Sequence, residues 1–70
     1  MVRFYFHIGN GKMVVLKDET GDHLADAAGA MAQAAVIAKE LADDEGQWRG
    51  YSVLVVDAQG AEIGRVPIAR

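Results

Sequence analysis

Residues 26–45 read DAAGAMAQAAVIAKELADDE, and this stretch predicts the only long helix of the chain. Apolar side chains recur there at steps of three and four residues, which places them on one stripe of a helix. The stripe runs through Leu24, Ala27, Met31, Ala34, Ala38 and Leu41. Asp26 is suited to cap the first turn, and Gly46 is suited to end the helix. Because acids occupy positions 43–45, at the negative end of the helix dipole, we expect the last turn to fray near Asp43.

The core-facing stripe consists mostly of alanine, so it predicts a thin core. Each alanine buries little apolar area, and we expect Met31 and Leu41 to contribute most of the burial. Val36 and Ile37 fall outside the centre of the stripe. Two adjacent apolar residues beside such a stripe indicate a second contact surface.

The segments on either side of the helix predict four strands. Residues 2–8 alternate apolar and polar side chains, and Gly9-Asn10-Gly11 predicts a tight hairpin turn into a return strand at 13–17. Residues 18–25 are interpreted as a polar connecting loop. The third and fourth strands are expected at 51–56 and 61–68, and Pro67 indicates an edge position for the fourth. The predicted fold is a single α+β domain over residues 1–70, a two-layer ββαββ arrangement of one helix on a four-stranded antiparallel sheet.

One helix covers only one face of a sheet. Alternation places Arg3, Tyr5 and His7 on the uncovered face. With Val53 and Val55 taken as the inward pair of the third strand, Leu54 and Val56 also fall on that face, where water is a poor partner. The residues predicted to form an interface are Leu54, Val56, Val36, Ile37 and Tyr5.

Length and charge limit the class of protein. The chain has 70 residues, a net charge of -3 and no cysteine, so neither a disulfide nor a cysteine metal site can add stability. A domain of this size has a marginal core, and association with a second copy is a common way to bury more surface. We therefore expect a homodimer.

The dispersed basic residues and the acidic balance do not favour the binding of nucleic acid. The N-terminus opens directly into a strand pattern, and no apolar run has the length of a membrane span, so a cytoplasmic location without a membrane partner is expected.

Several short motifs resemble a known family. They are R-F-Y-F-H-I at 3–8 followed by a Gly/Asn turn, the acids and glycine at 18–21, the helix start at 24–26, and the V-V-D…G…V-P pattern at 55–67. Together they resemble a family of small bacterial domains of unknown function that is common in rhizobia and related alphaproteobacteria. The resemblance implies a compact ββαββ-like unit without an assigned activity. The family carries polar or charged residues in its helix and third strand where this chain has Met31, Val36, Ile37 and Leu54, and this difference favours an additional contact surface.

The chemistry-bearing residues do not specify a reaction. His7 could carry a proton or contact a ligand, but a strand histidine that packs and hydrogen-bonds on a half-covered sheet is the favoured interpretation. The chain has one serine, Ser52, and one threonine, Thr20. No histidine stands at a spacing known to activate either hydroxyl as a nucleophile. The spacing of His7 and His23 does not support a zinc site. We therefore expect no catalytic residue, metal or cofactor, and a non-enzymatic interaction module. The alternative is a small RNA- or ligand-binding sheet that uses Arg3, Tyr5 and His7.

Overall fold

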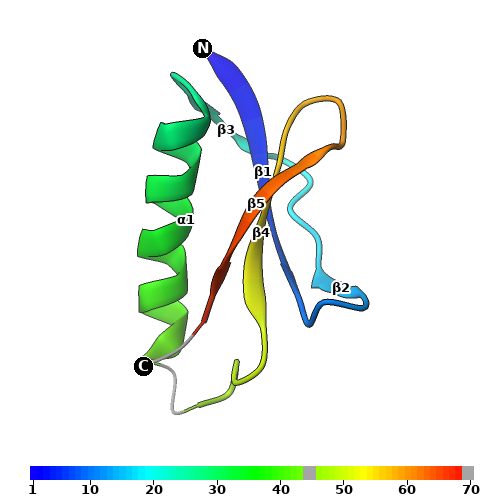
Figure 1. The fold of residues 1–70 in the computed structure, drawn as a ribbon, viewed down its shortest axis with the longest axis vertical. Coiled ribbons are helices and arrows are strands. Elements are labelled where there is room, and N and C mark those ends of the chain that lie inside the picture. The colour runs from blue at the N-terminus through cyan, green and yellow to red at the C-terminus, as the bar shows by residue number, and fades with distance from the viewer. Residues whose placement is uncertain (44–45, 69–70) are drawn as a thin grey trace.

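A computed structural model describes residues 1–43 and 46–68 as one helix packed against an antiparallel sheet (Figure 1). The elements in chain order are β1 (Val2–Gly9), β2 (Val14–Leu16), β3 (Asp22–Leu24), α1 (Ala27–Ala42), β4 (Ser52–Val56) and β5 (Glu62–Pro67). The main path of the sheet is β2-β1-β4-β5, and β3 also pairs with β1. The predicted two-layer α+β fold is thereby confirmed, and Pro67 lies in an edge strand as expected.

Within residues 1–43 and 46–68 the sheet has five strands, whereas four were predicted. The additional strand is β3, in the segment interpreted as loop, where Leu24 pairs with Val2 and Asp22 with Phe4. β1 extends well beyond β2, so its N-terminal half would otherwise leave backbone groups unpaired along that edge. Three residues of mixed polarity do not show the alternation by which strands are recognised in a sequence.

The helix begins as predicted and ends early. The Asp26 carboxylate accepts a hydrogen bond from the Gly29 N–H at 2.9 Å, which caps the first turn. The helix ends at Ala42 with Asp43 as its C-cap, close to the expected fraying point. Gly46 therefore does not end the helix directly, although it has a positive φ of 78°. Residues 44 and 45, which were included in the predicted helix, lie outside the described residues.

The buried line of α1 differs from the predicted stripe. It consists of alanines at every fourth position, Ala30, Ala34, Ala38 and Ala42, whereas Ala27 is exposed. Met31 and Leu41 are only half-buried and pack at the sides of this line. The expectation that they dominate the burial is wrong, because the helix lies so close to the strands that only methyl groups fit between them. The Met31 side chain reaches along the side of this line to Gly64 of β5, where a Cβ would lie 2.8 Å from the Met31 sulfur.

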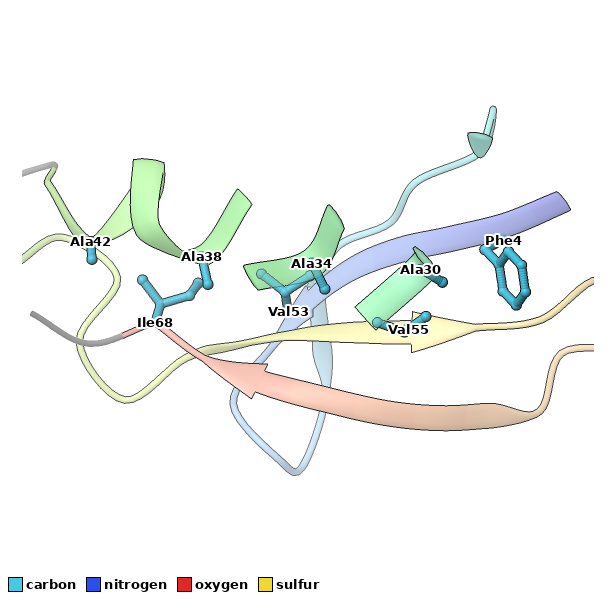
Figure 2. Packing of buried hydrophobic residues seen from close by; sticks show 8 residues of the cluster. All are labelled: Phe4, Ala30, Ala34, Ala38, Ala42, Val53, Val55 and Ile68. Atoms are coloured by element: carbon cyan, nitrogen blue, oxygen red, sulfur yellow. The ribbon is translucent and has the colours of Figure 1, made fainter. Parts of the chain in front are cut away.

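The core is correspondingly small. Figure 2 shows Phe4, Val53, Val55 and Ile68 against the four alanines of α1. Val53 and Val55 are the largest fully buried side chains in the described part of the chain, and they form the inward pair that was predicted. Trp48 packs against one end of this core and makes an edge-to-face contact with Tyr51. Half of the buried cluster is alanine, so the apolar area that stabilises the fold is limited.

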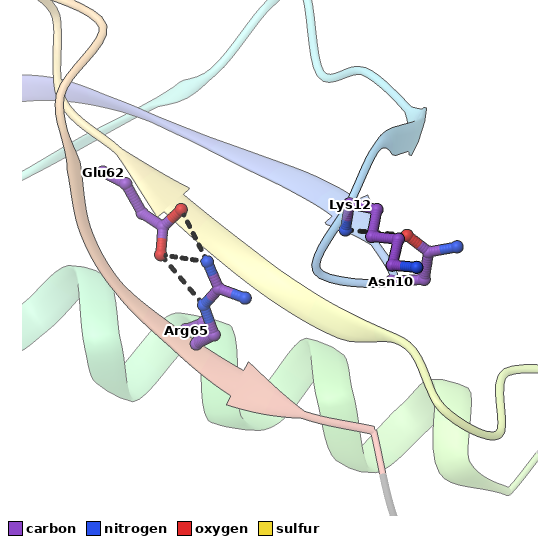
Figure 3. A network of polar contacts seen from close by, with 4 residues as sticks. All are labelled: Asn10, Lys12, Glu62 and Arg65. Atoms are coloured by element: carbon purple, nitrogen blue, oxygen red, sulfur yellow. Dashed lines mark hydrogen bonds and ion pairs between the residues drawn. The ribbon is translucent and has the colours of Figure 1, made fainter.

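A bulge in β5 positions the ion pair drawn in Figure 3. Val56 pairs with Glu62 and Val55 with Gly64, so the ladder contains one extra residue in β5. Residues three apart face opposite sides of a regular strand, and the bulge brings Glu62 and Arg65 to the same side. The Arg65 guanidinium donates to both carboxylate oxygens of Glu62 at 2.8 to 3.0 Å.

We expect the Glu62→Gln variant to change the free energy of unfolding by less than about 0.5 kcal/mol. Both side chains are exposed, so the attraction between them is weakened by water and salt. Urea unfolding at low and high salt measures the effect. A loss above about 1 kcal/mol would mean that the pair maintains the bulge.

Candidate functional site

The Asp18 carboxylate fills a gap along one edge of β1. That edge pairs with β2 at Ile8 and Gly9 and with β3 from Val2 to Phe4. Between the two pairings, the Phe6 N–H donates to Asp18 Oδ2 at 3.1 Å. One side chain thus substitutes for a strand partner where the neighbouring chain turns away.

The same carboxylate also holds its own loop. Asp18 Oδ1 accepts hydrogen bonds from the N–H groups of Thr20 and Gly21 at 3.1 and 3.0 Å. The Asp18 N–H donates to Nδ1 of His7 at 3.0 Å. Gly21 has a φ of 74°, and a Cβ there would lie 2.7 Å from the Phe4 carbonyl oxygen, so only glycine fits. The loop is therefore fixed against β1 by one carboxylate and one imidazole.

These contacts alter the ionisation of Asp18. Burial opposes the charged form of the carboxyl group, but hydrogen bonds from Gly21, Phe6 and Thr20 and the nearby His7 favour it. The favourable contributions prevail and lower the pKa of Asp18 below its ordinary value of 3.8. Asp18 is therefore a stable carboxylate throughout the neutral range.

Tyr5 and His7 form an aromatic surface on the sheet face opposite α1. They pair with Val56 and Leu54 of β4, while the inward residues of β1 pack against the core. The two rings are nearly parallel, with centroids 6.3 Å apart and planes 21° apart. Because Nδ1 of His7 accepts the Asp18 N–H, the neutral imidazole carries its proton on Nε2.

A cleft of about 400 Å³ lies over this aromatic surface. We call it the His7 cleft. Its lining consists of Tyr5, His7 and Val56 from the sheet, Lys17, Asp18 and Glu19 from the loop after β2, and Asp57, Ala58 and Gly60 from the turn between β4 and β5. Three carboxylates thus face the single lysine around an aromatic and aliphatic floor, so the cleft is acidic. Its volume is within the range of small-ligand sites.

The structure brings together only part of the predicted ligand-binding set. Tyr5 and His7 line the His7 cleft, but Arg3 does not. The Arg3 guanidinium donates to the Thr20 carbonyl oxygen at 2.8 Å and lies 3.4 Å from Nε2 of His23. Arg3 therefore supports the loop that borders the cleft, and the set becomes Tyr5 and His7 with loop residues that periodicity could not place.

The predicted interface residues lie in different environments. Leu54 is on the uncovered face as expected, but it is only 7% exposed, so the prediction that it meets water is wrong. The reason is that the β1–β2 hairpin and β5 surround it: Leu54 Cδ1 lies 3.2 Å from where a Cβ on Gly9 would be, and Met13, Val14 and Arg65 border the same hollow. Val56 and Tyr5 are half-buried in the cleft, and Ile37 is half-buried against the core. Val36 is 53% exposed on α1.

The largest run of exposed apolar residues was not among the predicted site residues. Met13, Val14, Val15 and Leu16 are 63%, 43%, 40% and 50% exposed. We call these four residues the hairpin patch. In Figure 1 the strand β2, which carries Val14, Val15 and Leu16, lies away from α1 at the far end of the sheet. The available signal was the unbroken run M-V-V-L, which lacks the polar alternation of a strand with one solvated face. For Asp18 the signal was the D-x-T-G pattern of a side chain that caps its own turn.

The described residues provide neither a metal centre nor a membrane-spanning helix. No group of three or more His, Asp or Glu side chains there could hold a metal ion. Within the same residues, no helix has the length and apolar character that crossing a bilayer requires.

Comparison with known proteins identifies the family. A family described as "Domain of unknown function (DUF6894)" matches residues 3–69. No curated protein and no solved structure matches the chain. The resemblance to a small domain of unknown function is confirmed by this match, whereas a bacterial origin stays a prediction. Because the match covers nearly the whole sequence, the chain belongs to the DUF6894 family of domains of unknown function.

Proposed function

We propose that this domain is a non-enzymatic interaction module that forms a homodimer through the hairpin patch. The observation that carries the proposal is the run of four consecutive exposed apolar residues, 13–16. Such runs are unfavourable in water and mark contact surfaces when they persist in a folded protein. The small alanine-rich core adds a thermodynamic reason, because a second copy supplies burial that the monomer lacks.

The geometry of β2 favours side-chain packing over continuation of the sheet. β2 has three residues, and its register with β1 shifts between Ile8 and Gly9. Short and bulged edge strands are poor templates for backbone pairing. A dimer would therefore place the two hairpin patches face to face across a two-fold axis. Glu62 and Arg65 border the adjoining hollow with Met13 and Val14, so they would lie at the polar rim of such an interface.

A non-enzymatic role is supported by the positions of the available nucleophiles. Ser52 and Thr20 do not line the His7 cleft, and the chain has no cysteine. Nδ1 of His7 is occupied by a backbone N–H, so that nitrogen is not free to act as a base. These features fit a binding domain better than a nucleophilic enzyme.

The double variant Met13→Glu/Val15→Glu is expected to abolish self-association. A two-fold dimer would bring four new carboxylates into its apolar centre, which should raise the dissociation constant at least about 100-fold. Sedimentation equilibrium from about 1 to 100 µM measures the mass against the 7.5 kDa of one chain.

Val36→Glu is the matched control, because Val36 is equally exposed but lies on α1. It should leave the association unchanged. A wild-type chain that stays monomeric to about 100 µM would overturn the proposal. If Val36→Glu dissociated the dimer and the hairpin variant did not, the interface would instead be the predicted helix surface.

The RNA-binding alternative receives less support from the positions of these residues. Stacking of bases would use Tyr5 and His7, but the cleft above them carries three carboxylates, which repel phosphate. Arg3, the third residue of the predicted RNA- or ligand-binding set, donates to the Thr20 carbonyl oxygen and does not line the cleft. A ligand for this surface should have the opposite charge.

A further inference from the structure

We propose that the His7 cleft binds a guanidinium group, as carried by arginine. This binding site is separate from the hairpin patch, and its occupation does not depend on self-association. Three features support it: two nearly parallel aromatic rings in its lining, carboxylates on two sides of those rings, and a volume suited to one extended side chain.

The floor favours a flat cation. The Tyr5 and His7 rings are nearly parallel, with planes 21° apart, and Val56 lies beside them in the lining of the cleft, so a planar group finds aromatic faces of one orientation to stack on. Guanidinium is planar and weakly hydrated, and it stacks on aromatic faces more readily than a compact ammonium does. The preference for arginine over lysine follows from this shape.

The carboxylates provide acceptors for the edges of the same group. Glu19 is exposed and makes no hydrogen bond or ion pair with the residues that the structure describes. On the other side, Asp57 Oδ1 accepts the N–H groups of Gln59 and Ala61 at 2.9 Å each, whereas Oδ2 has no partner in residues 1–43 and 46–68. A guanidinium between the two loops has donors on both edges, which a single ammonium cannot present in one plane.

The charge of the cleft selects cations. Asp18, Glu19 and Asp57 contribute three negative charges, and Lys17 contributes one positive charge. Asp18 remains ionised at neutral pH because its hydrogen bonds hold its pKa low. Lys17 is exposed at the rim and forms no ion pair within the described residues, so it does not neutralise the carboxylates directly. It should, however, weaken the binding of another cation by repulsion.

The test is an NMR titration of the full chain with N-acetyl-arginine methylamide. We expect a dissociation constant on the order of 1 mM, as for other fragment-sized ligands, with amide shifts concentrated at Tyr5, His7, Val56 and Asp57. The corresponding citrulline compound has the same shape without the charge and should bind at least about tenfold more weakly. The lysine compound should bind several-fold more weakly than arginine.

Three variants separate this site from general attraction to an acidic protein. Glu19→Gln should weaken binding about threefold, and Lys17→Gln should strengthen it about twofold, while both leave stability unchanged because their side chains are exposed. Glu40→Gln makes the same charge change on an exposed position of α1 and should have no effect.

The source of the guanidinium is distinguished with propylguanidine, which has the same single charge but lacks the peptide groups of the blocked arginine. Tighter binding of the blocked arginine identifies a peptide arginine as the ligand, and tighter binding of propylguanidine identifies a free guanidino compound. The proposal would be overturned if the citrulline compound bound as tightly as the arginine compound. It would also be overturned if Glu19→Gln and Glu40→Gln weakened arginine binding equally, or if the NMR chemical-shift changes lay outside the cleft. Since the titration can succeed with a monomeric chain, its outcome is independent of the proposed homodimer.

Discussion

Replacing Asp18 with alanine is expected to destabilise the domain by about 3 kcal/mol, the largest effect that we predict for any polar residue. The variant removes the acceptor for the N–H groups of Phe6, Thr20 and Gly21 together. Hydrogen bonds to a charged group contribute about 1.5 to 3 kcal/mol each, and partial access of water to the loop reduces their sum. A domain with so small a core has a total stability of about 3 to 5 kcal/mol, so the variant should retain at most about 2 kcal/mol and be up to about half unfolded at 25 °C.

Asp22→Ala is the matched control, because Asp22 is exposed in β3 and its side chain makes no hydrogen bond within residues 1–43 and 46–68. Its free energy of unfolding should stay within about 0.5 kcal/mol of the wild type. Chemical denaturation followed by circular dichroism measures both. Equal losses for the two variants would show that Asp18 acts only through its charge and not through these hydrogen bonds.

The contribution of Asp18 should also depend on pH. Its pKa is lowered in the folded state from the ordinary 3.8, so the folded protein binds this proton less readily than the unfolded chain. The stabilisation is therefore complete above about pH 4 and is lost as the pH falls through the folded-state pKa. The difference in stability between the wild type and Asp18→Asn should narrow below about pH 3.8 in urea titrations from about pH 6 to pH 2. A difference that stays constant over this range would contradict the assignment.

The second large effect is expected at Ala34, where leucine should cost about 3 kcal/mol. Ala34 is completely buried where α1 rests on the sheet, next to the fully buried Val53 and Val55. Three additional carbon atoms have no space there, so the helix must move away from the strands or the side chains must leave their preferred rotamers.

Ala35→Leu provides the control, because position 35 is exposed on the same helix. Leucine is nearly as good a helix former as alanine, so this variant should be within about 0.5 kcal/mol of the wild type. Thermal and urea unfolding distinguish the two. If Ala34→Leu were as stable as the wild type, the close contact of helix and sheet would be wrong.

The sequence predicted the elements whose pattern is repetitive and local. The helix, its Asp26 cap, the Val53 and Val55 pair and the edge position of Pro67 all follow from spacing or from backbone chemistry, and the structure confirms them. The centre of the helix stripe was misplaced because alanine counts little in a hydrophobic pattern. Alanines nevertheless mark the line of closest approach, where larger residues would not fit.

What could not be predicted depends on contacts between distant segments. β3 exists because β1 leaves an edge to be paired, and Leu54 is buried because the β1–β2 hairpin and β5 surround it. For the His7 cleft, alternation correctly placed Tyr5 and His7 on one face. The opposing carboxylates Glu19 and Asp57 come from two loops, and their approach is determined by the pairing of β1 with β4.

The row of alanines beneath α1 has a mechanical consequence. Methyl groups are short, so the alanine line by itself interlocks little with the side chains of β4 and β5. The longer side chains beside that line, Met31, Ile37 and Leu41, pack against the core at successive levels of α1, and they are therefore the contacts that resist movement of the helix along its own axis. The Met31 thioether ends over Gly64, where a Cβ would lie 2.8 Å from the sulfur, so a side chain at position 64 would displace Met31 and loosen one of these three anchors.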